Sequence, residues 1–243
     1  APRLAPTSED TLEPGMAERI ADRAPSTRVE VVPNFVDLDV LRPVPRDNAF
    51  AREHDLVGTP VISYAGVMGP AQSLDDLIDL AAAFPPSAGV RTLLIGEGRS
   101  RDALEARVSR EAVPGVGFID YQPYARVPEI YGASDLCVVA LAPDVATSAL
   151  PSKVLRIMAC GRPVLALCSA DSDLAREVTE AACGLVVDPQ DAANAAGEVI
   201  ALLTDRERLA EMGRRGRAHV EANYARGVVA DRYRALIDEV STG

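Results

Sequence analysis

Short apolar runs rich in Val, Ile and Leu recur along this chain from residue 60 onward. The segments between them show the three-to-four-residue spacing of amphipathic helices and begin with Ser or Asp. This alternation is typical of βαβ units. We therefore expect an α/β fold built on a Rossmann-like, doubly wound parallel sheet of about six strands, with helices at the C-terminus. The predicted strands are residues 61–65, 92–95, 116–119, 136–141, 164–167 and 185–187, and the clearest helices between them are 73–84, 100–110 and 171–182.

The two ends of the chain do not show this alternation. Residues 1–28 are rich in Pro, Ala and acidic side chains, with one weak helical pattern at 12–21, and we interpret them as the remnant of a preceding domain or as a linker. Residues 191–239 predict three consecutive helices. The predicted organisation is therefore a Rossmann-like domain at 29–222 and a terminal helix at 223–243.

Composition narrows the functional classes. A hydrophobic content of 48% in 243 residues is ample for a sheet-centred core, and a net charge of -11 argues against nucleic acid as a partner. The sequence shows neither an apolar run of membrane-spanning length nor a basic leader followed by an apolar one, so we expect a soluble, cytoplasmic protein. The cysteines lack CxxC spacing and are expected to be small core residues; they are Cys137, Cys160, Cys168 and Cys183.

Residues 150–167 give the strongest indication of a ligand site. Their order predicts a turn, a short helix, a glycine and a buried strand. Pro151 suits the first turn of a helix and Ser152 is a typical cap, so backbone N–H groups and the positive end of the helix dipole would face an anion. Lys153 adds a full charge, and Gly161 is expected to end the helix. The pattern predicts a phosphate site, although an αβ unit that binds nothing has the same outline.

This block resembles the donor-site segment of the family 4 retaining glycosyltransferases of the GT-B class. The similarity is to the members with Pro-Ser-Lys followed by Ala-(small)-Gly-Arg-Pro-Val, which build bacterial surface polysaccharides. Residues 29–37 are similar to the family's connection into the donor domain, with Phe35 in place of the usual Gly.

The resemblance covers about residues 29–240, which corresponds to the second half of a complete enzyme. It implies that residues 29–222 bind the donor nucleotide-sugar and that the last helix returns to an N-terminal, acceptor-binding domain absent from this sequence. We therefore expect the chain to be a fragment, a processed product or one subunit of a split enzyme.

Two glycine-containing loops follow the first two predicted strands. The loop at 64–75 resembles the family's donor loop, which implies that Gly66 and Gly69 let the backbone approach the ligand, with Gln72 where many members place a phosphate-binding Lys. Gly96 and Gly98 resemble a turn beside the nucleotide. On pattern alone, both loops are equally consistent with tight βα turns.

Residues 117–123 resemble the family segment whose main chain reads the edge of the base. The resemblance implies a backbone contact at Ile119 and places Tyr121 near the uracil. A buried edge strand followed by a turn would give the same sequence pattern.

The main departure concerns two family glutamates, one facing the transferred sugar and one binding the ribose hydroxyls. Ser148 and Arg156 stand at these positions. A guanidinium cannot accept hydrogen bonds from ribose hydroxyls, although it could bind a diphosphate or an acidic sugar. We assign no catalytic residue. His54 and His219 lie outside any motif and are expected at the surface, and no visible motif requires a metal or another cofactor.

The resemblance implies a UDP-sugar donor, with a GDP-sugar as second choice, and retaining transfer of a hexosyl or acetamidosugar group to a surface polysaccharide or glycolipid. The isolated chain is expected to bind nucleotide and turn over nothing, because the acceptor domain is missing. Two alternatives remain open: a non-catalytic scaffold, and an isomerase like UDP-sugar 2-epimerase, which the scarcity of histidine disfavours. The arginines of 206–217 alternate with glutamates and favour an ion-paired helix face over a contact with the inner membrane face.

Overall fold

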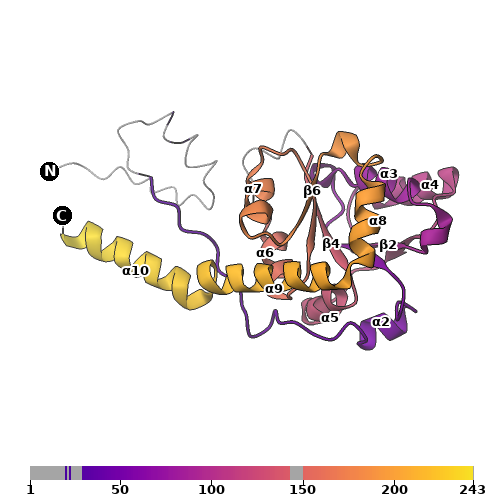
Figure 1. The fold of residues 1–243 in the computed structure, drawn as a ribbon. Helices are drawn as coiled ribbons and strands as arrows, with labels where there is room; N and C mark the ends of the chain where they lie inside the picture. The colour runs from indigo at the N-terminus through magenta and orange to yellow at the C-terminus, as the bar shows by residue number, and fades with distance from the viewer. Residues whose placement is uncertain (1–19, 21, 23–28, 143–149, 243) are drawn as a thin grey trace.

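The computed structural model describes residues 20, 22, 29–142 and 150–242, and its centre is a six-stranded parallel sheet (Figure 1). The strand order is β3-β2-β1-β4-β5-β6, which confirms the predicted fold. The chain runs outward from β1 to β3 and then returns to β4 on the other side of β1, and open α/β sheets bind ligands at such a reversal. The strands are β1 (Val61–Ala65), β2 (Arg91–Ile95), β3 (Val116–Ile119), β4 (Leu136–Ala140), β5 (Val164–Leu167) and β6 (Gly184–Val187). Observed and predicted strand ends differ by at most one residue.

Helices cover both faces of the sheet. One face packs against α3 (Leu74–Ala82), α4 (Arg101–Glu111) and α8 (Ala196–Thr204). The other packs against α5 (Val127–Gly132), α6 (Ser152–Ala159) and α7 (Asp173–Glu180). Because both faces are covered, the strands are apolar on both sides, which is why they appear in the sequence as continuous hydrophobic runs.

The central strands contribute buried side chains to both faces of the sheet. In β4, Cys137 and Val139 face one helical layer, and Leu136 and Val138 face the other. All four cysteines are buried and free, so the prediction that they are small core residues is confirmed. Burial raises the pKa of the Cys137 thiol to about 12, which keeps this side chain protonated and unreactive.

Two short helices were not predicted from the sequence. They are α2 (Ala49–Glu53), which Asn48 caps by accepting a hydrogen bond from the N–H of Ala51, and α5. Each has no more than six residues, so neither repeats its apolar spacing often enough to be recognised.

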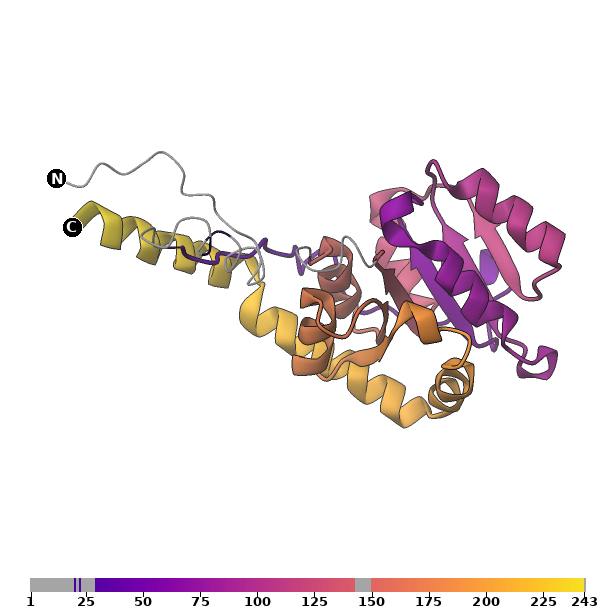
Figure 2. The same cartoon turned by 90° about the horizontal axis from the view of Figure 1, so that it is seen from above.

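The predicted C-terminal helices are α8, α9 (Arg206–Asn223) and α10 (Arg226–Thr242). Helix α9 runs along the domain, and Figure 2 shows α10 projecting beyond the sheet and its covering helices. The segment before α2 is joined to these helices: the N–H of Val36 donates to Tyr224 O over 2.8 Å, and Arg217 donates to Leu41 O over 2.8 Å. The predicted remnant at 1–28, with its helix at 12–21, lies outside the described residues except for residues 20 and 22.

Three arginines of α9 are paired with carboxylates on the same helix, whereas Arg206 pairs with Asp135. Glu211 pairs with Arg214 and with Arg215, and Arg217 pairs with Glu221 over 2.6 Å. This confirms the predicted ion-paired helix face. Among the described residues, no helix combines the length and apolar character needed to cross a bilayer.

Candidate functional site

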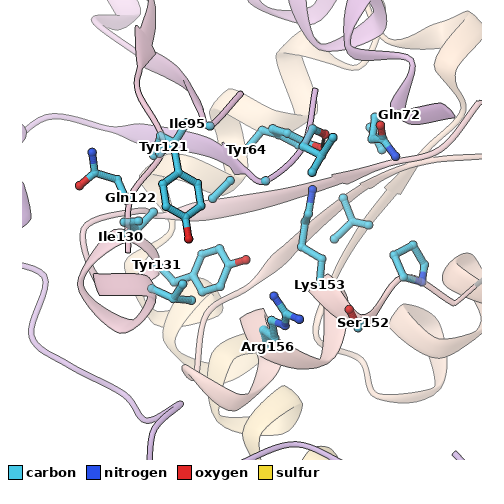
Figure 3. Close-up of a pocket in the computed structure, with 18 of the residues that line it drawn as sticks. Tyr64, Gln72, Ile95, Tyr121, Gln122, Ile130, Tyr131, Ser152, Lys153 and Arg156 are labelled. Atoms are coloured by element: carbon cyan, nitrogen blue, oxygen red, sulfur yellow. Dashed lines mark hydrogen bonds between the residues drawn. The ribbon is translucent and has the colours of Figure 1, made fainter. Parts of the chain in front are cut away.

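A pocket of about 500 Å³ opens at the carboxyl ends of β1, β2 and β4, where the strand order reverses (Figure 3). The amino end of α6 closes one side of it. Seven of the ten residues predicted for the site line this pocket: Gly66, Gln72, Gly96, Tyr121, Ser152, Lys153 and Arg156. The other three, Gly69, Gly98 and Ile119, are not part of its wall.

The two glycine loops pack against each other through their backbones. The N–H of Gly66 donates to Ile95 O over 2.9 Å, and a Cβ added to Gly96 would lie 2.2 Å from Gly66 O. Gly96 also has φ +133°, a conformation that residues with a side chain rarely adopt. A Cβ on Gly98 would come equally close to Met68 O, at 2.2 Å. Both glycines are therefore required by loop packing, and Gly98 has this role alone.

Lys153 is half-buried in the pocket wall and brings a cationic side chain to it. Its ammonium nitrogen lies 3.5 Å from the centre of the Tyr64 ring, and a Cβ on Gly66 would lie 2.9 Å from that nitrogen. Burial, with a smaller contribution from the charge of Arg156, lowers the pKa of Lys153 to about 7. Among the described residues, no carboxylate pairs with this ammonium.

The sequence makes this ammonium unusual in another way. The chain has 25 basic residues in total, and Lys153 is its single lysine. An ammonium is a compact charge whose pKa responds readily to burial, whereas a guanidinium stays charged. The single lysine of the chain therefore lies where its surroundings bring the pKa of its ammonium close to neutral pH.

Helix α6 is oriented by its apolar side, which buries Val154, Leu155, Ile157 and Met158. Its amino end therefore faces the pocket, where the first N–H groups of a helix have no partner within the helix. The predicted cap was wrong: Pro151 is the capping residue, and Ser152 is the first helical residue, with no side-chain hydrogen bond to the helix end. Gly161, with φ +64°, follows the helix in the left-handed conformation, as expected.

Arg156 lies one helical turn after Lys153 and also lines the pocket. Its guanidinium carbon is 5.5 Å from the centre of the Tyr124 ring, a distance typical of a cation–π contact. Within the described part of the chain, no carboxylate pairs with it. The wall thus carries two cations from one helix, and neither pairs with a carboxylate of residues 29–142 or 150–242.

Three side-chain oxygens of the pocket accept hydrogen bonds from neighbouring protein groups. The amide oxygen of Gln72 accepts from Gly69 N–H over 3.0 Å, so Gly69 helps to fix the loop without lining the cavity. The amide oxygen of Gln122 accepts from Arg126 over 3.0 Å. The exposed carboxylate of Glu97 accepts from Arg101 over 2.8 Å.

Comparisons with known proteins identify the family of this chain. The sequence model of the family described as "Glycosyl transferases group 1" matches residues 59–205, which include all six strands and the pocket. This chain belongs to that family.

The chain is 33% identical over 202 residues to a D-inositol 3-phosphate glycosyltransferase of Nocardia farcinica, a match that covers 79% of this chain and 43% of that protein. It is 30% identical over 215 residues to a GDP-mannose-dependent monoacylated alpha-(1-6)-phosphatidylinositol monomannoside mannosyltransferase of Corynebacterium glutamicum, covering 84% of this chain and 54% of that protein. The chain thus spans about half the length of these curated relatives.

Its fold is similar to that of Anabaena HepE, solved in complex with UDP-glucose. The TM-score is 0.76 and the sequence identity 19%, and the match covers 96% of this chain and 63% of that chain. At this identity the likeness shows the fold alone. That fold is the α/β architecture expected for one half of a GT-B enzyme.

The sequence-based prediction missed several residues that line the pocket. Val139, Ala140 and Leu141 come from the end of β4, and the rule that parallel strands place their carboxyl ends at one edge could have identified them. Tyr131 comes from the unpredicted helix α5 and had no such signal. Ile119 was predicted at the site, but its carbonyl accepts from Gly96 N–H within the sheet region. Ser148 lies outside the described residues.

The histidines are not at the pocket, and the expectation that both are surface residues was wrong in part. Both are half-buried. His219 Nε2 lies 2.8 Å from Glu177 Oε1, and this carboxylate raises the pKa of His219. The two residues join α9 to α7, so His219 has a partner within the fold. Among residues 29–142 and 150–242, no His, Cys, Asp and Glu side chains cluster as metal ligands would.

Proposed function

We propose that this chain is the donor domain of a retaining glycosyltransferase and that the pocket binds the diphosphate of a nucleotide-sugar. The observation that carries the proposal is that Lys153 lies half-buried in the pocket wall beside the amino end of α6, with no carboxylate paired to its ammonium among the described residues. A partly desolvated cation without a counterion is costly, and a phosphate group would supply the opposite charge. Helix amino ends favour the same ligand.

In this proposal the pocket acts on the leaving group. When the bond between the sugar and the diphosphate breaks, negative charge develops on the diphosphate. Lys153, Arg156 and the amino end of α6 would stabilise that charge, which is the kind of fixed electrostatic contribution that lowers a transition-state barrier. If the pocket acts in this way, none of the described residues has to serve as a nucleophile.

We propose a UDP-sugar as the first donor to test and a GDP-sugar as the second. HepE was solved with UDP-glucose, whereas the mannosyltransferase relative is named as GDP-mannose-dependent. The name of the mannosyltransferase relative supports a glycolipid acceptor, whereas the other relative is named for D-inositol 3-phosphate. Because the relatives are about twice as long, we propose that acceptor binding requires a second domain.

Isothermal titration of this chain with UDP, up to millimolar concentration, tests the proposal. We expect Lys153→Ala to weaken UDP binding about tenfold or more, because a hydrogen bond to a charged group contributes about 1.5–3 kcal/mol. Arg208→Ala is the matched control, since it removes one positive charge from an exposed position on α9. Absence of wild-type binding, or equal affinity in the Lys153 variant, would contradict the proposal and favour a scaffold role.

A further inference from the structure

The pocket has two chemically different ends, and Figure 3 shows Tyr121 and Gln122 across it from Ser152. Lys153, Arg156 and the amino end of α6 supply positive charge to one end. The other end is formed where β2 and β3 finish, and its lining residues are Ile95, Gly96, Glu97, Tyr121 and Gln122. They bring backbone groups, an aromatic ring and a carboxylate, which repels a phosphate. A flat, neutral group such as the base of a nucleotide fits this second end.

This second end requires two loops from neighbouring strands to stay aligned. Gly96 follows β2, and Tyr121 lies two residues after the end of β3. One backbone hydrogen bond joins the loops, from Gly96 N–H to Ile119 O over 2.9 Å. The pairing of β2 with β3 stops at Ile95 and Ile119. Beyond that point, the position of Tyr121 relative to Gly96 depends on contacts outside the sheet.

Arg101, the first residue of α4, makes such contacts. Its guanidinium donates to Gly96 O over 2.8 Å and to Asp120 Oδ1 over 2.8 Å, so one planar group joins both loops. It also donates to Glu97 Oε1 over 2.8 Å and to Glu105 Oε1 over 2.7 Å. The Arg101 side chain is only 14% exposed, although that of Asp120 is 83% exposed. A guanidinium has its N–H donors in a fixed plane, which suits it to holding several acceptors at set positions.

We propose that Arg101 is a positioning residue for the nucleoside end of the pocket, because it holds the loops after β2 and β3 at the separation that the base of the donor requires. The inference rests on the proposed function, which places the diphosphate at Lys153 and leaves the opposite end for the nucleoside. Arg101 does not line the pocket, so it acts through Gly96 and through the segment of Asp120 and Tyr121.

The exposure of its partners indicates that Arg101 matters more for the loops than for the fold. The carboxylates of Glu97, Glu105 and Asp120 are all more than a third exposed. Exposed ion pairs add little to the stability of a fold. Loss of Arg101 should therefore let the two loops shift while the sheet and the cation end of the pocket stay intact.

Isothermal titration with UDP and with pyrophosphate, which lacks the nucleoside, tests this role. We expect Arg101→Met to weaken UDP binding about tenfold, roughly the effect of one lost hydrogen bond to the base, and to change pyrophosphate binding by less than about twofold. Arg101→Lys should restore part of the UDP affinity, because an ammonium can bind one loop but lacks the planar set of donors. Arg110→Met is the matched control, since it removes an exposed arginine from the same helix. It should leave both affinities unchanged.

A double-mutant cycle with Asp120→Asn separates positioning from a general loss of structure. Asp120 is exposed, so this substitution removes its charge pair with Arg101 at little cost to folding. We expect Asp120→Asn to weaken UDP less than Arg101→Met does, and the double variant to bind UDP no more weakly than Arg101→Met alone. Thermal unfolding checks that each variant is folded, and pyrophosphate binding checks that its cation end is intact.

Failure of this inference can be distinguished from failure of the proposed function. If pyrophosphate binds in a Lys153-dependent manner but Arg101→Met leaves UDP affinity unchanged, or weakens UDP and pyrophosphate equally, the proposed function stands and the role of Arg101 is wrong. That role is also wrong if Arg101→Met weakens UDP-glucose but not UDP, because the sugar would then occupy this end. If the wild-type chain binds neither UDP nor pyrophosphate, both proposals are wrong.

Discussion

At the scale of single residues, the site depends on a few side chains whose surroundings change their chemistry. Lys153 has an ordinary side chain, but its position above the Tyr64 ring and beside Gly66 reduces the contact of its ammonium with water. A charged form that loses hydration becomes less favourable, and the pKa falls. The sequence identifies Lys153 as a cation; its position in the fold makes it a titrating group near neutral pH.

Lysine-labelled protein should show this titration directly by NMR, because the chain has one lysine and therefore one ammonium signal. We expect a midpoint near the pKa of about 7 and an upward shift when UDP binds. UDP affinity should fall as the pH rises above that value, because the bound state requires the protonated ammonium. A midpoint near 10 in the free protein would contradict the burial of this side chain.

The lowered pKa of Lys153 also makes the stability of the folded chain depend on pH. The folded pKa is lower than the usual value of 10.5, so the unfolded chain binds more protons between about pH 7 and 10.5. Lys153 therefore makes the free energy of unfolding rise as the pH rises across this window. As the pH falls from about 10.5 to about 7, the same contribution lowers the free energy of unfolding. Chemical denaturation of wild type and Lys153→Met at several pH values should show this difference in slope.

At the scale of elements, the loops after β1 and β2 hold the pocket open by packing backbone against backbone. Gly96 is one of the tight points, because no side chain fits between it and Gly66. The sequence indicated a turn with two glycines, and either a ligand contact or loop packing could explain them. The distances show that loop packing alone accounts for Gly98, whereas Gly96 both packs and lines the pocket.

Replacing Gly96 with Ala should therefore lower stability by several kcal/mol, since backbone atoms must move to admit the new methyl group. Gly197→Ala is the control, because a Cβ there meets nothing within 4 Å and the position lies in helix α8. We expect this control to be neutral or slightly stabilising. Denaturant unfolding measures both, and equal stability of the two variants would show that the loops can separate at little cost.

At the scale of the whole molecule, segments far apart in the sequence are held together by one buried carboxylate. Asp135 accepts a hydrogen bond from Val61 N–H over 2.8 Å and pairs with Arg46 and with Arg206. It connects the segment before α2, the start of β1 and the start of α9. Burial lowers the pKa of Arg46, which shows that this ion pair is partly removed from solvent.

Asp135→Asn should destabilise the chain by about 1.5–3 kcal/mol, because it removes the charge that the half-buried guanidinium of Arg46 pairs with. Asp231→Asn, which removes an exposed pair with Arg234 on α10, should cost no more than about 1 kcal/mol. Urea unfolding of both variants tests this difference. Similar stabilities would mean that the buried pair contributes no more than a surface one.

The sequence by itself determined the strand and helix pattern, the short helix at Lys153 and the parallel sheet that gathers the loops. These features follow from the spacing of apolar residues and from glycine and proline, which act on near neighbours. Only the tertiary structure decided that Ser152 does not cap α6, that Gly98 serves loop packing and that the Lys153 ammonium lies over the Tyr64 ring. Burial and hydrogen-bond partners depend on segments distant in the sequence, so local patterns do not contain them.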